Sequence, residues 1–292
     1  MKMMKRIGFL LLVVLLTAMK GDKPAYIIYN AEGKQVKYKD LVEDALKADI
    51  VFFGEQHNNP ISHWLELELT KDMFTNKNMN LVLGAEMFET DNQLVLNEYL
   101  SGRIAQKNFE KEAKLWDNYQ TDYKPLVEFA KTNKLAFIAT NIPRRYASLV
   151  NKQGFEGLDS LDNVAKNYIA PLPVKYDPEL KGYKAMLEMN EGMPGGGHGT
   201  NNLPKAQAIK DATMAHFILK NWQPGKTFLH YNGAYHSDNY EGIIWYLQQE
   251  KPELKILTIS TIEQDTIDAM KDESLKLADF IICVPTEMTK TY

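Results

Sequence analysis

Five short apolar segments that alternate with helical patterns constrain the fold of this chain more than any other feature. Each segment is apolar along nearly its whole length, which is typical of strands buried on both faces of a parallel sheet. This alternation predicts an α/β domain with a mainly parallel sheet and helices on both faces. The predicted strands are residues 49–55, 80–86, 134–141, 226–232 and 255–260, and the predicted helices are residues 61–74, 91–100, 125–132, 204–222 and 240–250.

Two regions depart from this alternation. Residues 25–38 contain two short apolar runs around Asn-Ala-Glu-Gly, which predicts a hairpin. Residues 151–203 form a long insertion that begins with a weak helical pattern and ends in a glycine-rich run. A stretch of this length and glycine content is not a simple connection between two parallel strands. We therefore expect one domain, residues 22–292, with an inserted helical and loop subregion.

The first residues have the layout of a secretory signal peptide. Three basic residues precede an apolar run at residues 7–16, which is too short to span a bilayer comfortably. We expect residues 1–21 to be a signal peptide and the mature chain to be exported to the periplasm or the cell envelope. An uncleaved membrane anchor is the alternative, because the segment lacks a clean cleavage site.

Cysteine usage and charge limit the partners. Cys283 is the only cysteine and lies far from the N-terminal segment, so the chain offers neither an intramolecular disulfide nor a lipoprotein cysteine. Removing residues 1–20 leaves 30 basic residues against 38 acidic residues, a formal net charge of −8. That balance argues against nucleic acid as a partner.

Polar side chains stand where the predicted strands end. Glu55 closes the first strand and Glu86 the second, and His57 and His236 lie just beyond strand ends. A lone glutamate in such a place is more often a helix cap or a surface ion pair. Because the carboxyl ends of parallel strands meet at one edge, where ligands bind, the set as a whole favours a shared site. Asn141, His230 and Asn232 belong to the same set.

The chemistry of this set leaves two alternatives open. Two imidazoles and two carboxylates suit zinc or another divalent transition metal. They equally suit metal-free hydrolysis, with a Glu or His as general base and Arg144 or Arg145 holding an anion. The two Gly-x-x-His motifs begin at Gly54 and Gly233, which we expect to let the chain turn. The motif is short and weakly specific, so we assign no metal ligand.

Taken together, the motifs resemble the ChaN-like haem-binding proteins. The resemblance runs from about Ala48 to Ser260, and the order and spacing of the motifs are more specific than any one of them. It implies an exported bacterial protein of haem and iron uptake, with an α/β core and a mainly helical addition. The matching stretches are Gly54–His57, Gly84–Phe88, Asn141–Arg144, residues 206–215 and Gly233–His236.

The same double Gly-x-x-His pattern is similar to that of the erythromycin esterases and of the Tiki and TraB type proteins. In those proteins it implies hydrolysis, with or without a metal. The haem-binding prediction therefore rests on residues outside this pattern.

In ChaN-like proteins haem lies largely between protomers, with tyrosine and histidine at the iron. The resemblance thus implies haem as the cofactor, a homodimer on haem binding, and outer-membrane haem-uptake machinery as a partner. Tyr176, Tyr183 and His198 of the insertion are the candidate haem-binding residues. Nearby methionines could pack on a porphyrin face, or they could simply bury one face of a helix.

We therefore predict an exported haem-binding protein that serves haem or iron acquisition. The alternative is a hydrolase whose catalytic residues are Glu55, His57, Glu86 and His236, with Arg144 positioning the substrate. Two further histidines, His63 and His216, lie within helical patterns. We expect both to be ordinary helix residues, because neither has an evident ligand partner three or four residues on.

Overall fold

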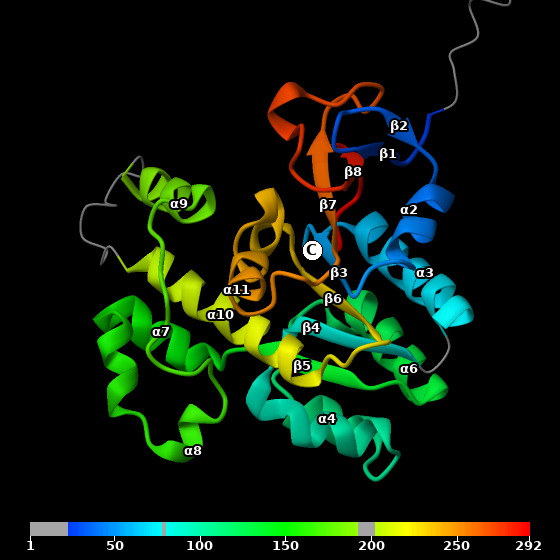
Figure 1. Ribbon diagram of the computed structural model, residues 1–292. Helices are drawn as coiled ribbons and strands as arrows, with labels where there is room; N and C mark the ends of the chain where they lie inside the picture. Colours follow the sequence, from blue (N-terminus) through cyan, green and yellow to red (C-terminus); the bar gives the residue numbers. More distant parts are fainter. Residues whose placement is uncertain (1–22, 78–79, 192–201) are drawn as a thin grey trace, which may run out of the picture.

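An eight-stranded sheet forms the centre of the computed structural model, which describes residues 23–77, 80–191 and 202–292 (Figure 1). The predicted signal peptide, residues 1–21, lies outside the described residues. The strands are β1 (Ile27–Asn30), β2 (Gln35–Val36), β3 (Ile50–Glu55), β4 (Leu81–Glu89), β5 (Phe137–Asn141), β6 (Thr227–Gly233), β7 (Ile256–Gln264) and β8 (Phe280–Pro285). Their order across the sheet is β2-β1-β8-β7-β3-β6-β4-β5.

The sheet is mainly parallel, as predicted. Strands β8, β7, β3, β6, β4 and β5 run parallel to one another, and the β1–β2 hairpin adds two antiparallel strands at the edge. All five predicted strands and the hairpin are confirmed. The sequence prediction did not include β8, whose apolar residues pair with both β1 and β7.

Helices cover both faces of the sheet (Figure 1). Side chains alternate along a strand, so Val51 and Phe53 enter one hydrophobic cluster while Ile50 and Phe52 enter the other. The first cluster packs against α2 (Tyr38–Ala45), α3 (Pro60–Lys77), α4 (Gln93–Leu100), α5 (Gln106–Glu112) and α6 (Lys124–Asn133). The second packs against α7 (Arg144–Gln153), α10 (Leu203–Asn221) and α11 (Ile243–Glu250).

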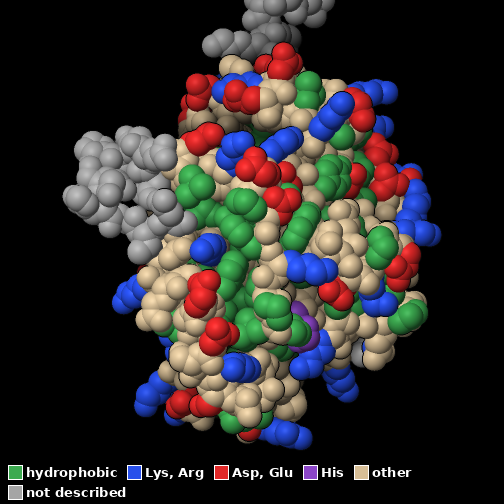
Figure 2. Space-filling model, turned by 60° about the vertical axis from the view of Figure 1, so that its left-hand side comes forward, with side chains coloured by type: hydrophobic (Ala, Val, Ile, Leu, Met, Phe, Trp, Pro, Cys, Tyr) green, Lys and Arg blue, Asp and Glu red, His purple; other side chains and the backbone are tan. Residues whose placement is uncertain are grey.

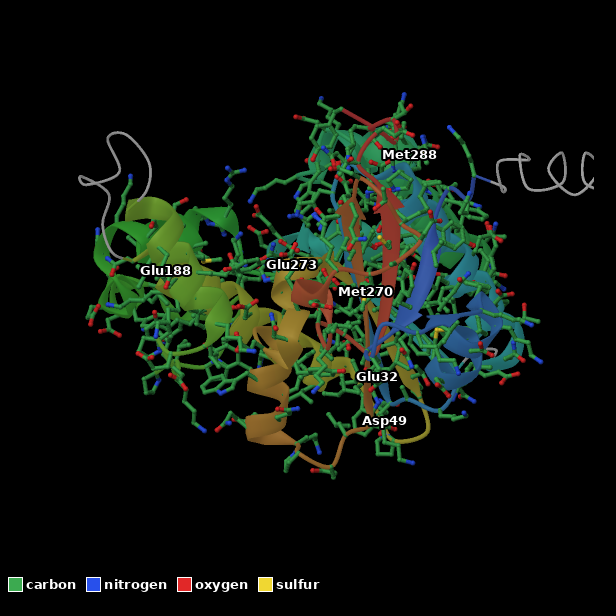
Figure 3. All side chains as sticks on the ribbon, turned by 90° about the horizontal axis from the view of Figure 1, so that it is seen from above. Glu32, Asp49, Glu188, Met270, Glu273 and Met288 are labelled. Carbon is green, nitrogen blue, oxygen red and sulfur yellow. The ribbon has the colours of Figure 1, made fainter. Side chains whose placement is uncertain are left out.

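The described part of the insertion contains the 3-10 helix Phe155–Ser160 and two α-helices. The α-helices are α8 (Asn163–Lys166) and α9 (Lys181–Glu191). Glu188 of α9 lies at one side of the molecule, away from the sheet (Figure 3). The glycine-rich run that includes His198 lies outside the described residues.

The carboxyl edge of the sheet has a clear position in the molecule. Asp49 precedes β3 and Met288 follows β8, and the two lie on opposite sides in Figure 3. The C-terminal tail then crosses this edge, where the backbone N–H of Thr291 donates to the carbonyl of Asn58 over 2.9 Å. No helix within the described ranges is long and apolar enough to cross a membrane.

Candidate functional site at the carboxyl edge of the sheet

Four of the five predicted catalytic residues meet at the carboxyl edge, in two pairs. His57 Nδ1 lies 2.7 Å from Glu55 Oε1, and His236 Nε2 lies 3.1 Å from Glu86 Oε1. The backbone N–H of Gly233 donates to the other oxygen of Glu86 over 2.9 Å. The strand-end rule therefore brought these side chains together correctly.

The glycines of the two motifs serve close approach. The expectation that they let the chain turn is wrong for Gly54, which lies inside β3, whereas Gly233 is the last residue of β6 and precedes the 3-10 helix Ala234–His236. Neither glycine has a positive φ. A Cβ on Gly54 would lie 2.8 Å from the carbonyl oxygen of Ile259 and 2.9 Å from the Cα of Ala234. A Cβ on Gly233 would lie 2.8 Å from His57 Cε1. Glycine is needed because backbone and imidazole pack where a side chain would otherwise lie.

The Glu86–His236 pair continues into a buried chain of polar groups. His236 Nδ1 lies 2.5 Å from Asp211 Oδ1, and the hydroxyl of Tyr183 donates to Asp211 Oδ2 over 2.7 Å. Burial alone would lower the pKa of His236, but the carboxylates of Glu86 and Asp211 outweigh it and raise that pKa to about 9. Burial opposes ionisation of Glu86, yet the His236 imidazolium holds the pKa of Glu86 well below its usual range. His236 is therefore a buried cation between two carboxyl groups.

The Glu55–His57 pair also continues into the interior. The hydroxyl of Tyr123 donates to Glu55 Oε1 over 2.6 Å. His63 Nδ1 lies 3.3 Å from Glu55 Oε2 and 3.1 Å from Glu66 Oε2. The expectation that His63 lacks a partner one turn on is wrong, because Glu66 stands three residues later on α3 and both side chains are buried.

The start of α3 fixes the position of His63. The side-chain oxygen of Asn59 accepts the backbone N–H groups of Ile61 and Ser62 over 3.0 and 3.2 Å. Pro60 occupies the first position of the helix, where its missing N–H costs nothing. These local signals set the first turn of α3 just beyond the strand end, so that His63 points back towards Glu55.

His57 differs from the other three residues in being half-exposed. Its side chain is 41% accessible, whereas those of Glu55, Glu86 and His236 are buried. Its ring packs edge-on against Trp116, with 4.9 Å between the ring centroids. Burial lowers the pKa of His57, but Glu55 outweighs this effect and the pKa is raised. Of the four residues, His57 is thus the one placed to meet a ligand.

The structure does not bring Arg144 into contact with either pair. Arg144 is exposed at the start of α7. Its neighbour Arg145 pairs with Asp91 over 2.6 Å. Within the described part of the chain, no hydrogen bond or ion pair of Arg144 is found. Its predicted role in holding substrate stays a prediction.

The predicted haem-binding residues fall in different environments. Tyr176 is half-buried, and its ring stacks on that of Tyr183 with 5.7 Å between centroids. Tyr183 is buried, and burial together with Asp211 raises its pKa well above the usual range. Its hydroxyl is already engaged by Asp211, so it belongs to the Glu86–His236 chain. His198 lies outside the described residues.

A groove of about 700 Å³ lies away from these pairs, between the insertion, α10 and α11. This groove was not predicted from the sequence. Its lining includes the proline-interrupted run Pro171–Val174, which cannot continue a helix. Half-buried His216 lies in its wall, and burial together with Lys220 lowers the pKa of His216. Figure 2 turns the side of α7, α8 and α9 towards the viewer and shows hydrophobic side chains gathered in a band there. The groove is lined by residues 170–175, Ala212, Ala215, His216, Leu219, Lys220, Tyr246, Gln249 and Glu250.

Comparison with known proteins identifies both a family and a fold. The family model described as haem-binding uptake, Tiki superfamily, ChaN matches residues 41–247. A structure of cofacial haem binding to ChaN of Campylobacter jejuni superposes with a TM-score of 0.66 at 20% identity, covering 88% of this chain and 96% of that chain. This likeness confirms the α/β fold.

Two further proteins are more distant. A mutant of the erythromycin esterase EreC in its open conformation superposes with a TM-score of 0.45 at 10% identity, covering 81% of this chain and 77% of that one. The chloroplastic protein RETICULATA-RELATED 5 of Arabidopsis thaliana is 26% identical over 192 residues, which is 62% of this chain and 26% of that protein. The chain thus spans about a quarter of the length of this curated relative.

Proposed function

The chain belongs to the ChaN family of haem-binding uptake proteins in the Tiki superfamily, and we propose that it binds haem. The observation that carries this proposal is the family match over residues 41–247, which includes the strand-end pairs and most of the groove. Haem binding needs an apolar slot for the porphyrin, a ligand for the iron and cations for the propionates.

The groove meets these three needs. Its volume of about 700 Å³ is in the range of small-molecule and cofactor sites. Leu172, Val174 and Leu219 provide apolar walls, and Lys220 lies in the same lining. His216 has a lowered pKa, so its imidazole is neutral at pH 7 and has a lone pair free for iron. When bound there, haem would supply the redox and ligand chemistry of its iron.

Tyr176 is the second candidate iron ligand beside His216. It follows Lys175, which lies in the groove lining, and it is half-buried. Tyr183 is a poorer candidate, because its buried hydroxyl already donates to Asp211. We therefore expect iron ligation by His216 or Tyr176, with His198 as the alternative that the sequence alone favoured.

An absorbance titration of residues 22–292 with hemin tests this proposal. We expect a saturable, stoichiometric Soret band that shifts or weakens in His216→Ala or Tyr176→Phe. His57→Ala is the matched control, because that histidine lies at the other site and should leave the band unchanged. A band altered only by His198→Ala would assign iron ligation to that histidine and refute His216 and Tyr176 as the ligands. The absence of a saturable band would refute haem binding itself.

We further infer export and a role in haem or iron acquisition. Support comes from the signal-peptide pattern of residues 1–21 and from the uptake function that the family description carries. The mature chain would then work in the periplasm or cell envelope, as a homodimer when loaded and together with outer-membrane uptake machinery. Cell fractionation of the full-length chain and sedimentation with and without hemin test these points. A monomer at saturating hemin would refute the dimer.

Hydrolysis is the second candidate function. The half-exposed imidazole of His57, hydrogen-bonded to the buried carboxylate of Glu55, has the arrangement of a base oriented by a carboxylate. An esterase and peptidase screen with His57→Ala as the inactive reference tests it. Activity that survives this substitution would refute His57 as the base.

A further inference from the structure

A cluster of buried side chains beneath the Glu55–His57 pair indicates a binding site distinct from the groove. One ligand atom from each of Glu55, His63 and Glu66 lies within 4.8 Å of the other two. The relative exposures of the three residues are 3%, 5% and 0%. Glu55 comes from the end of β3, and the other two come from one face of α3. Strand and helix thus direct two carboxylates and one imidazole at the same buried point.

Two of the carboxylate oxygens at this point have no hydrogen-bond partner. They are Glu55 Oε2 and Glu66 Oε1, and both are buried. Buried polar atoms are nearly always paired with protein, water or an ion, so two unpartnered carboxylate oxygens in one buried cluster indicate a place for a further group.

The hydrogen bonds of His63 show which of its two nitrogens is directed at the carboxylates. Its Nε2 lies 3.0 Å from the backbone carbonyl oxygen of His57, which can only accept, so Nε2 carries the proton. Nδ1 faces the carboxylates, 3.1 Å from Glu66 Oε2 and 3.3 Å from Glu55 Oε2. Burial alone would lower the pKa of His63, but these carboxylates outweigh it and raise that pKa to about 10. Without an ion Nδ1 therefore holds a proton there, and a metal ion that binds would replace that proton. Metal-ligating histidines characteristically donate their other N–H to a backbone carbonyl or a carboxylate in this way.

Two of the three separations between the ligand atoms are close to those around a small divalent ion. Two ligands that each lie about 2.0–2.2 Å from a tetrahedral zinc ion are separated by roughly 3.3–3.6 Å. The observed separations from His63 Nδ1 are 3.1 Å to Glu66 Oε2 and 3.3 Å to Glu55 Oε2. A set of one nitrogen and several oxygen donors suits zinc and neighbouring transition metals better than calcium.

Surrounding residues hold the three ligands in place. The hydroxyl of Tyr123 donates to Glu55 Oε1 over 2.6 Å, which leaves Oε2 turned towards His63. Asn118 donates to the carbonyl oxygen of His57 over 2.9 Å and to Asp122 Oδ2 over 2.7 Å. Asp122 Oδ2 itself lies 3.6 Å from His63 Nε2. Outer partners of this kind orient ligands in metal sites.

We propose that Glu55, His63 and Glu66 form a binding site for a divalent transition-metal ion of the zinc class. The site is separate from the haem groove, because α3 packs on one face of the sheet and α10 and α11 pack on the other. It borders His57 through Glu55, and His57 is half-exposed. An ion held there would lie on the interior side of His57, the half-exposed residue at which a ligand would enter.

Calorimetric titration of the chelator-treated mature chain with Zn²⁺, without haem, tests the site. We expect one ion per chain, and Co²⁺ should give the visible absorption of a low-coordinate site. His63→Gln and Glu66→Gln should each lower the affinity at least tenfold, whereas Glu68→Gln on the same helix, whose side chain pairs with exposed Lys71, should leave it unchanged. No stoichiometric binding by the wild type would mean that a proton neutralises the cluster, and would overturn the proposal. Undiminished binding in both variants would also overturn it.

A measurement on the wild type covers the case in which the variants do not fold. In imidazole ¹⁵N spectra, Zn²⁺ should shift the Nδ1 resonance of one histidine whose Nε2 keeps its proton. If no histidine behaves in this way, His63 is not a ligand. Because haem takes no part in these measurements, their failure would leave the proposed haem binding unaffected.

Discussion

Raising the pH should destabilise the protein through His236. The pKa of His236 is about 9 in the folded chain and about 6.5 in an unfolded one. A pKa raised on folding stabilises the fold fully below the unfolded value and loses that effect as the pH rises through the folded value. The residue is only 4% exposed, so solvent screening is weak. At about 1.4 kcal/mol per pKa unit, the contribution is about 3 kcal/mol.

Urea unfolding from pH 6 to pH 9.5 measures this contribution. His236→Gln keeps a polar group between Glu86 and Asp211 but cannot become a cation. The difference in unfolding free energy between wild type and this variant should shrink by about 3 kcal/mol across the range. His216→Gln is the control, because the pKa of His216 is lowered on folding, so the difference for this variant should not shrink as the pH rises. A difference that stays constant with pH would refute a buried imidazolium at His236.

Three further substitutions test the packing around the edge. Gly54→Ala should cost about 1–3 kcal/mol in urea unfolding, because its Cβ would meet the backbone of two other segments; a neutral effect would contradict the close approach. Thr140→Val should cost about 1–3 kcal/mol, because buried His230 loses its 2.8 Å partner, and Thr140→Ser should restore most of it. Asp91→Asn should cost less than about 1 kcal/mol, since its partner Arg145 is exposed, and the effect should disappear at high salt.

The parallel core was predictable because each of its strands is an uninterrupted apolar run between turn signals. Two features were not. The segment Phe280–Pro285 is as apolar as the others, but periodicity alone cannot tell a short buried strand from other buried chain. Strand β7 continues to Gln264 because its last residues pair with β8, a contact between distant segments. Sequence windows report local preference, and these features depend on pairing.

The sequence could predict that the strand-end residues lie together, but it could not predict which further residues contact them. Strand ends in a parallel sheet share an edge, so Glu55 and Glu86 could be placed together with their histidines. Asp211 lies within the family stretch 206–215, yet nothing local marks it as the partner of His236, because α10 packs against the sheet from far along the chain. Glu66 carried a readable signal, because it is a carboxylate three residues after His63 on the same helix face.

Haem and the divalent metal ion should bind independently of each other, and a substitution of His57 can test this. Its Nδ1 lies 2.7 Å from Glu55, and its ring lies against Gly233, whose N–H is bound by Glu86. The buried polar groups around Glu55 and those around Glu86 therefore meet at the half-exposed imidazole of His57. The groove lies on the opposite face of the sheet, against α10 and α11. A substitution of His57 should consequently change how fast an ion reaches the Glu55 cluster without changing the affinity for hemin. If it changed both, the assignment of the two ligands to opposite faces would be wrong.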